Sequence, residues 1–213
     1  MEAVQIGTGP LSRSDVVAVA RYGARVELSE EAGAAIDNAR AIIDDLAGAA
    51  EPVYGISTGF GALATRHIPA DQRAHLQRSL IRSHAAGNGP RVEDEVVRAL
   101  MVLRLSTMAT GHCGVRRTTA QAYAALLNSP LVPVIGEYGS LGCSGDLAPL
   151  AHCALAVMGE GEVVDAGVVR PAAEALADLP RRNAHTPGVF LREMDDEGLG
   201  GHRVQEVVRG RPW

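Results

Sequence analysis

The chain contains 213 residues with a formal net charge of −5, and all 20 of its basic side chains are arginine. Because lysine is absent, chemistry that needs it is excluded: Schiff-base catalysis, a pyridoxal-phosphate anchor and the Walker A phosphate loop. The mild acidity argues against nucleic-acid binding, which needs a basic face, while the 46% of apolar residues can form a large buried core.

Most of the chain shows helical periodicity. Ser29, followed by two glutamates, is typical of an N-cap with acidic residues at the positive end of the helix dipole. Gly87 and Gly111 each follow a periodic segment and are expected to end helices. We therefore predict helices at residues 32–47, 71–86, 92–110, 115–127 and 146–158.

Two of these predicted helices carry most of the apolar surface. Residues 92–110 have the clearest pattern, because seven apolar side chains form one wide face. These residues are Val92, Val96, Val97, Leu100, Met101, Leu103 and Met108. Residues 146–158 are apolar almost all round, which predicts a buried helix.

Strand signals are few. Residues 25–28 form one short candidate, and residues 162–165 and 168–170 flank Ala166-Gly167 as a possible β-hairpin. The predicted fold class is therefore mainly α with a few short strands. We expect residues 1–180 to form one domain. Residues 181–213, of which eleven are charged, are expected to be a divergent, disordered surface tail.

Cysteine usage and hydropathy bear on where the protein works. The three cysteines have no CxxC spacing, so we expect no disulfide framework and a reducing, cytoplasmic setting. No signal peptide is recognisable, and the most apolar stretch, residues 100–109, is far too short to cross a bilayer. His112-Cys113 has no second ligand pair in the sequence, so we predict no metal site.

Two glycine-rich segments stand apart from the helical pattern. The first runs from Tyr54 to Gly61 and holds three glycines beside a tyrosine and a phenylalanine. Such a composition fits the interior of neither a helix nor a strand. Glycine is used where the backbone needs a positive φ or where a ligand approaches closely. This segment is therefore either a functional loop or an ordinary connection between two helices.

The second segment runs from Gly139 to His152, with glycine at every third position before an apolar helix begins. A phosphate cradle is disfavoured because lysine and the GxGxxG pattern are missing, and a nucleophile elbow fails because glycine directly follows Ser144. The tripeptide Cys143-Ser144-Gly145 suits a third chemistry. The unhindered Gly145 nitrogen attacks the carbonyl carbon of Cys143, and loss of water closes a five-membered ring. A second dehydration converts Ser144 to an exocyclic methylidene, an electrophile made only from the chain.

Together the two segments resemble the signatures of the aromatic amino acid ammonia-lyases, the family of histidine, phenylalanine and tyrosine lyases. The resemblance extends over residues 5–178 and implies the N-terminal part of the helical ammonia-lyase fold. It implies a carbon–nitrogen lyase that acts on a small-molecule amino acid and is a homotetramer in its full-length members. The implied cofactor is methylidene-imidazolone (MIO), formed autocatalytically from Cys143-Ser144-Gly145. The family usually has Ala-Ser-Gly there, and only the backbone carbonyl of Cys143 enters the ring.

The resemblance also implies roles for single residues. The methylidene of processed Ser144 is the electrophile that bonds to the substrate, a form of covalent catalysis. Tyr54 is implied as the base that removes the weakly acidic β-proton. Because an ordinary tyrosine has a pKa of about 10, we expect the site to lower that value.

Ser83-His84 stands where the family's residue pair tracks the substrate ring. Ser-His resembles the histidine lyases, His-Leu the tyrosine lyases and Phe-Leu the phenylalanine lyases. His84 can form a hydrogen bond with an imidazole, which leucine could not, so both residues are predicted to bind substrate. The implied reaction is the non-oxidative deamination of L-histidine to urocanate in histidine catabolism. Ser57 stands where histidine lyases often carry asparagine, and we do not expect it to be a site residue.

Family members are more than twice as long as this chain, and their Asn-Gly-Thr stretch has no counterpart here. Three hypotheses follow. The first is the N-terminal part of a histidine lyase from a truncated, split or frame-shifted reading frame, weakly active or inactive alone. The second is the same chemistry on another substrate, as in a tyrosine or phenylalanine lyase or aminomutase. The third is a non-catalytic partner subunit derived from the family.

Overall fold

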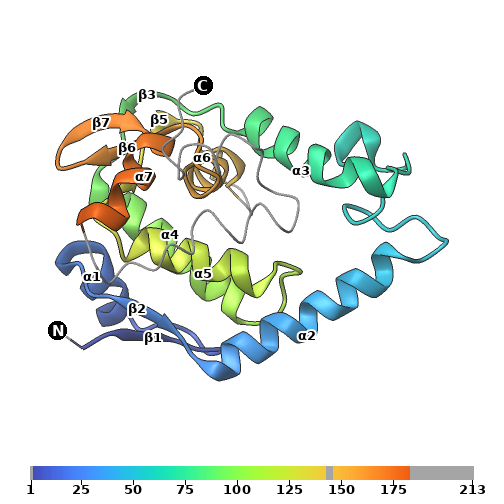
Figure 1. The fold of residues 1–213 in the computed structure, drawn as a ribbon, viewed down its shortest axis with the longest axis horizontal. Helices are drawn as coiled ribbons and strands as arrows, with labels where there is room; N and C mark the ends of the chain where they lie inside the picture. Colours follow the sequence, from blue (N-terminus) through green and yellow to red (C-terminus); the bar gives the residue numbers. More distant parts are fainter. Residues whose placement is uncertain (1, 143–145, 183–213) are drawn as a thin grey trace.

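The computed structural model describes residues 2–142 and 146–182 and confirms a mainly helical fold with a few short strands. Its helices are α1 (Arg13–Tyr22), α2 (Glu30–Ala47), α3 (Ala70–His84), α4 (Asp94–Ala109), α5 (Arg117–Leu127), α6 (Leu147–Val157) and α7 (Ala172–Arg182), with a 3-10 turn, η1 (Gly61–Leu63). Its strands are β1 (Val4–Ile6), β2 (Val26–Leu28), β3 (Asn88–Arg91), β4 (Val132–Pro133), β5 (Gly136–Tyr138), β6 (Glu162–Asp165) and β7 (Val168–Pro171). Figure 1 shows their arrangement.

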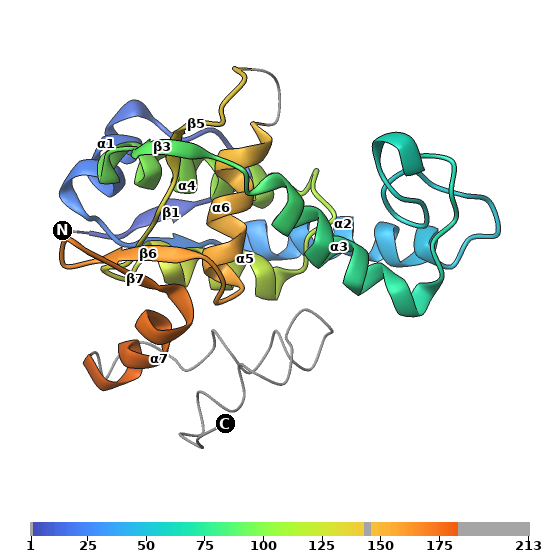
Figure 2. The ribbon, with the colours of Figure 1, turned by 90° about the horizontal axis from the view of Figure 1, so that it is seen from above.

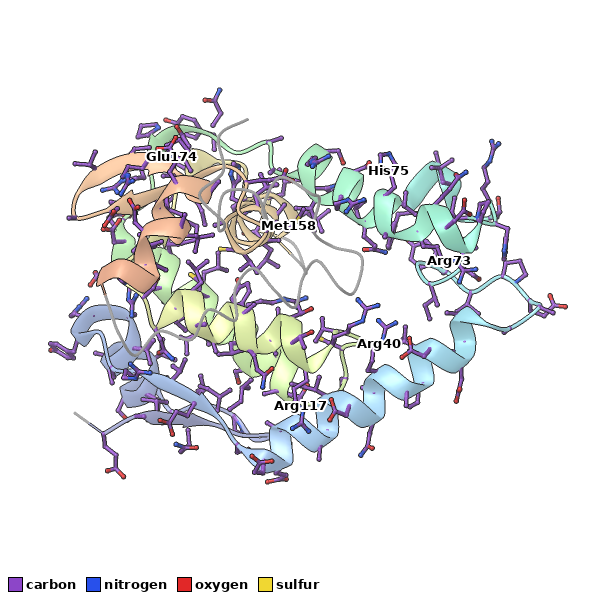
Figure 3. The ribbon with its side chains drawn as sticks, in the orientation of Figure 1. Arg40, Arg73, His75, Arg117, Met158 and Glu174 are labelled. Carbon is purple, nitrogen blue, oxygen red and sulfur yellow. The ribbon has the colours of Figure 1, made fainter. Side chains whose placement is uncertain are left out.

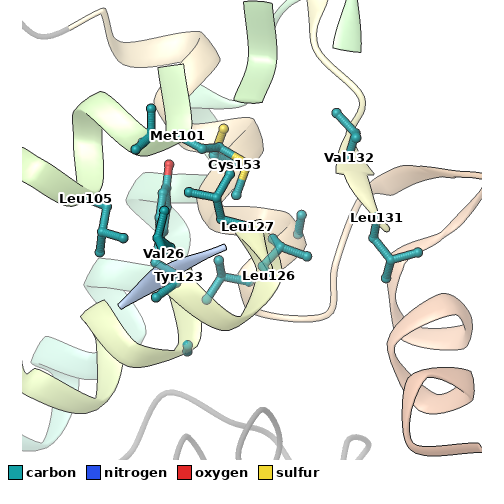
Figure 4. Close-up of a cluster of buried hydrophobic side chains, with 14 of the residues drawn as sticks. Val26, Met101, Leu105, Tyr123, Leu126, Leu127, Leu131, Val132 and Cys153 are labelled. Atoms are coloured by element: carbon teal, nitrogen blue, oxygen red, sulfur yellow. The ribbon is translucent and has the colours of Figure 1, made fainter. Parts of the chain in front are cut away.

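The hydrophobic core lies around α4, which packs against α1, α2 and α5. α5 also contacts α6, so the helix that follows the second glycine-rich segment rests on this core. Figure 4 shows buried side chains from all three helices together, among them Met101 of α4, Tyr123 of α5 and Cys153 of α6. Burial raises the pKa of the Cys153 thiol to about 11, so this cysteine stays protonated and unreactive at neutral pH.

The buried face of α4 is narrower than the sequence predicts. Val97, Met101 and Met108 are buried, whereas Val96 and Leu103 are each 50% exposed. Val96 and Leu103 are seven residues apart, close to two helical turns, so they lie on one stripe that points away from the core. The predicted apolar face is therefore correct at its centre and wrong at its edge.

The strands join neighbouring segments in small sheets. β1 pairs with β2 in parallel, and β3 pairs with β5 antiparallel. β6 and β7 form the predicted hairpin, and β4 pairs with the other edge of β6. The turn of the hairpin is made by Ala166 and Gly167, both with positive φ. The strand predicted at residues 25–28 is confirmed as β2.

Helix boundaries agree with the sequence at some ends only. The N-cap at Ser29 is confirmed, because its hydroxyl accepts a hydrogen bond from the N–H of Ala32 at 3.1 Å. α3 ends at His84, two residues before the predicted end: the Ala86 N–H donates to the His84 carbonyl at 2.8 Å and the Gly87 N–H donates to His152, so neither continues the helical pattern. Sequence analysis missed α1, although a capping box between Ser12 and Asp15 marks its start.

Sequence analysis also missed α7, which packs on β6 and β7. This helix includes residues 181 and 182, the first two residues of the predicted tail. The remainder of that tail, residues 183–213, lies outside the described residues, as do Met1 and residues 143–145. The domain boundary at residue 180 stays a prediction.

Two leucines on α4 test the observed burial pattern. Leu105 is fully buried, so we expect Leu105→Ala to lower the free energy of unfolding by about 2–5 kcal/mol through lost contacts and a new cavity. Leu103→Ala, two residues away on the exposed stripe, is the matched control and should lose less than about 1 kcal/mol. Urea denaturation followed by circular dichroism measures both. Equal losses would contradict the packing of α4 described above.

Candidate functional site

The loop from Tyr54 to Gly61 is folded around the backbone of Val53. The Val53 carbonyl accepts hydrogen bonds from the N–H groups of Ile56, Ser57 and Thr58 at 3.1, 3.0 and 3.3 Å. The buried Ser57 closes this turn, because its hydroxyl accepts from the Val53 N–H at 2.8 Å. Ser57 therefore holds the loop together.

The backbone geometry of this loop explains why a glycine stands at position 55. Gly55 has a φ of +72°, and a Cβ there would lie 2.9 Å from the Phe60 ring. That ring meets Tyr54 edge-on, with 5.7 Å between centroids and 79° between planes. Tyr54 is nevertheless 62% exposed. The loop thus fixes the direction of the Tyr54 ring and presents it on the outside of the molecule.

The Tyr54 loop belongs to a connecting lobe, residues 48–69, which joins α2 to α3 at one end of the molecule in Figures 1 and 2. Arg73, in the first turn of α3, fixes this lobe: its guanidinium donates to the carbonyls of Ala47 at 2.8 Å and Ile68 at 3.1 Å (Figure 3). The described part of the second glycine-rich segment, residues 139–142 and 146–152, lies toward the other end of α3, where Gly139 approaches Gly87. The structure therefore does not bring Tyr54 and that segment together.

Ser83 and His84 form the last turn of α3, which packs against α6. The Leu80 carbonyl lies 2.8 Å from Nδ1 of His84 and also accepts from the Ser83 hydroxyl at 2.9 Å. Because a carbonyl only accepts, Nδ1 is the donor in this contact, and it also lies 3.0 Å from the Ser83 hydroxyl, which leaves Nε2 as the ring nitrogen available to a ligand. His84 is half-buried and Ser83 is exposed, so the pair can present a ring nitrogen and a hydroxyl to a ligand.

The chain enters the second glycine-rich segment through residues 136–142, here called the arm. The arm packs against the residues that follow α3. A Cβ on Gly136 would come within 2.5 Å of the Asn88 backbone, and a Cβ on Gly139 would come within 2.8 Å of Gly87 Cα. Gly139 also meets Ala148 in the first turn of α6. The structure therefore brings the Ser83-His84 end of α3 together with both flanks of the predicted cofactor-forming residues.

Cys143, Ser144 and Gly145 themselves lie outside the described residues, so their roles stay predictions. Their flanks can be tested for fit. Gly142 has a positive φ of 62°, and the Leu141 N–H donates to the Asp146 carboxylate at 3.2 Å across the gap. Residues 141 and 146, which flank the tripeptide, are thus held close to each other, and such flanks suit the tight backbone bend that ring closure would require.

His152 has a position that sequence analysis did not foresee. It belongs to the helix that the sequence predicts to be buried, but it is only half-buried and its Nε2 accepts a hydrogen bond from the Gly87 N–H at 3.0 Å. Burial lowers the pKa of His152, and the bond from Gly87 needs the unprotonated nitrogen. The residue lines a pocket of about 280 Å³ together with Arg91 and Glu162.

The described residues contain neither a membrane span nor a metal-ligand cluster. No helix among them is long and apolar enough to cross a membrane. In residues 2–142 and 146–182, no three side chains of His, Cys, Asp or Glu are grouped so that they could hold a metal ion.

Comparison with known proteins defines the class. The family model of aromatic amino acid lyases matches residues 11–184. The chain belongs to the aromatic amino acid lyase family. This agrees with the resemblance of the two glycine-rich segments and with the helical fold.

Individual relatives narrow the comparison. The histidine ammonia-lyase of Streptomyces avermitilis is 62% identical over 200 residues, which cover 93% of this chain and 38% of that protein. The ergothionase of Treponema denticola has a TM-score of 0.79 at 34% identity, over 82% of this chain and 35% of that one. The tyrosine aminomutase of Streptomyces globisporus has a TM-score of 0.77 at 35% identity, over 83% and 33%. The chain thus spans little more than a third of the length of these relatives.

Gly55 offers a test of the Tyr54 loop. Gly55→Ala forces a side chain into a left-handed backbone and against Phe60, so we expect the loop to lose about 1–3 kcal/mol of local stability. Hydrogen exchange of residues 51–60, measured by mass spectrometry, should accelerate accordingly. Gly9→Ala is the matched control, because a Cβ there meets nothing within 4 Å. An unchanged exchange rate in Gly55→Ala would show that the loop does not need its observed backbone.

His152 offers a test by pH. Because its pKa is lowered from the ordinary value of about 6.5, the unfolded chain binds a proton there first as the pH falls. The stability that the neutral ring contributes is complete above about pH 6.5 and is lost as the pH falls toward the lowered pKa. We expect wild type to lose stability more steeply than His152→Gln, which cannot titrate. Titratable and charged groups on the surrounding elements, His84, Arg91 and Glu162, are common to both proteins. Parallel pH profiles would refute the expectation.

Proposed function

We propose that this chain carries the imidazole-recognising and cofactor-forming part of a histidine ammonia-lyase. The reaction would convert L-histidine to urocanate and ammonia, by removal of a β-proton and cleavage of the bond between Cα and nitrogen. The 62% identity to the Streptomyces avermitilis enzyme supports this activity, although the match covers little more than a third of that protein.

The observation that carries the proposal is the state of His84. With Nδ1 donating to the Leu80 carbonyl at 2.8 Å, Nε2 is the nitrogen left for a ligand, and it is an acceptor when the ring carries a single proton. A substrate imidazole has a ring N–H that can donate to such an acceptor, whereas the ring of phenylalanine has no donor. A tyrosine substrate could donate from its hydroxyl, but in the tyrosine lyases the family pattern has His-Leu at this pair.

The fold alone does not separate histidine lyases from aminomutases. The tyrosine aminomutase of Streptomyces globisporus resembles this chain with a TM-score of 0.77, close to the 0.75 of the histidine ammonia-lyase of Trypanosoma cruzi. The choice between these substrates therefore rests on the side chains at the end of α3. Ser83-His84 favours histidine, and a tyrosine- or phenylalanine-specific enzyme is the alternative that the experiments below address.

The remaining roles follow from the family. MIO, formed from Cys143-Ser144-Gly145, supplies the electrophile that activates the amino acid for loss of ammonia. Tyr54 takes the β-proton, and the fixed, exposed ring of the Tyr54 loop suits a base that is offered to another chain. We accordingly propose that the active form is a homo-oligomer in which Tyr54 and His84 of one site come from different copies.

Formation of the cofactor can be measured without any activity. We expect the purified 213-residue chain to have an intact mass lower by two water molecules than its sequence requires, with the loss mapped to residues 143–145 by fragmentation. Ser144→Ala, which lacks the hydroxyl needed for the second dehydration, should not show the double loss. A wild-type chain that retains both waters would support a non-catalytic partner subunit over a lyase.

Substrate choice can be measured in a chimera. Residues 1–178 of this chain, joined to the following part of the Streptomyces avermitilis enzyme, should release urocanate from histidine, followed by ultraviolet absorbance. We expect His84→Leu to lower kcat/KM for histidine roughly 10- to 100-fold, the effect of one lost hydrogen bond in a polar site. His75→Leu, on the same helix, is the control and should leave it unchanged. Histidine turnover that survives His84→Leu, or a preference for tyrosine, would favour the alternative.

A further inference from the structure

Three pieces of chain meet beyond the end of α3. The first is the chain that leaves α3, residues 85–91, and the second is the arm at residues 136–142, which pairs with it through β3 and β5. The third is α6, which begins directly after the predicted cofactor-forming residues. Any group that fixes all three sets the separation between His84 and the flanks of that tripeptide.

Gly87 is the point at which the three pieces touch. Its Cα lies 2.8 Å from the position that a Cβ on Gly139 would take, so the arm rests directly on its backbone. Its N–H has left the hydrogen-bond pattern of α3 and donates to Nε2 of His152 on α6. A backbone N–H at a half-buried position needs such an acceptor, and His152 supplies it from 65 residues away in the sequence.

We infer that His152 is a positioning residue of the lyase site, which ties α6 to the Gly87 backbone and thereby holds His84 in register with the cofactor-forming segment. This inference rests on the proposed function. His152 acts through the backbone of Gly87, and no contact with substrate is required. A second contact also links α3 with the end of α6. The guanidinium of Arg82 in α3 donates hydrogen bonds of 2.8 and 2.6 Å to the carboxylate of Glu160, just beyond α6. The Arg82–Glu160 contact joins two side chains at the surface, whereas the His152 contact holds the backbone N–H of Gly87.

Substitutions at residue 152 distinguish this role from simple packing. His152→Gln keeps an acceptor oxygen near the place of Nε2, whereas His152→Leu keeps bulk and has no acceptor. The side chain of His152→Asn also carries an acceptor oxygen, but it is too short to reach the Gly87 N–H. If the leucine variant fails to fold, the asparagine variant still tests whether the hydrogen bond itself is needed in a polar side chain. His112→Leu, at an exposed histidine outside these elements, is the control.

Two readouts on the 213-residue chain test the inference. Hydrogen exchange of residues 85–91 and 136–142 should accelerate about tenfold in His152→Leu and His152→Asn, which corresponds to about 1.4 kcal/mol, and should stay near wild type in His152→Gln. The share of chains that have lost two waters should fall in the same two variants and recover in His152→Gln. A role in packing alone predicts the opposite order, with leucine tolerated better than asparagine or glutamine.

The outcomes separate this inference from the proposed function. If wild type retains both waters, the proposed function fails, and the exchange data alone decide whether His152 holds the two segments. If wild type forms the ring, equal exchange and equal ring formation in wild type, His152→Leu and His152→Asn overturn the inference. Equal impairment of the glutamine and leucine variants in both readouts also overturns it.

Discussion

The backbone of Gly87 lies against the backbone of Gly139, and the geometry of the candidate site depends on this contact. A side chain at Gly139 would need the space of Gly87 Cα, and one at Gly136 would need the space of the Asn88 backbone. Either would push the arm away from α3, and the start of α6 would move with it. Glycine is favoured at position 142 for a different reason, because its φ of +62° lies in the left-handed region that other residues rarely adopt. The regular glycine spacing in the sequence therefore combines at least two separate physical requirements.

α6 can serve this site because it is also part of the core. Its buried side carries small residues, among them Cys153 and Ala156, which let α5 approach closely. On another side of α6, His152 accepts a hydrogen bond from the Gly87 N–H in the chain that follows α3. The arginines add further contacts, since a guanidinium donates from separate nitrogens at fixed angles in one plane. Arg73 bonds two carbonyls of separate segments in this way. The lack of lysine, which at first only excludes functions, thus coincides with arginines that hold the ends of α3.

Local signals in the sequence predicted local structure well. The cap at Ser29 and the hairpin at Ala166-Gly167 were found because each depends on residues a few positions apart. The end of α3 was misplaced by two residues: the chain leaves the helix at Ala85, and Gly87 then bonds a histidine 65 residues further on, a contact that no local pattern reveals. The role of His152 was missed for the same reason. Motif resemblance assigns roles to Tyr54 and His84, which stay predictions. The helix predicted between them at residues 71–86 is confirmed as α3, but no motif shows how its packing places the two segments.

That separation constrains how the proposed reaction can occur. α3 has 15 residues and is about 22 Å long. Arg73 fixes the connecting lobe that carries Tyr54 to the first turn, while Ser83-His84 forms the last. Tyr54 and His84 of one chain therefore cannot meet over one small amino acid while α3 and its tie at Arg73 remain intact. If both serve one deamination, they come from different copies, which makes the exposed and edge-packed ring of Tyr54 a contribution to a neighbour's site. Under the proposed function such a site would form only on assembly, so the rigidity of α3 would itself link oligomerisation to catalysis.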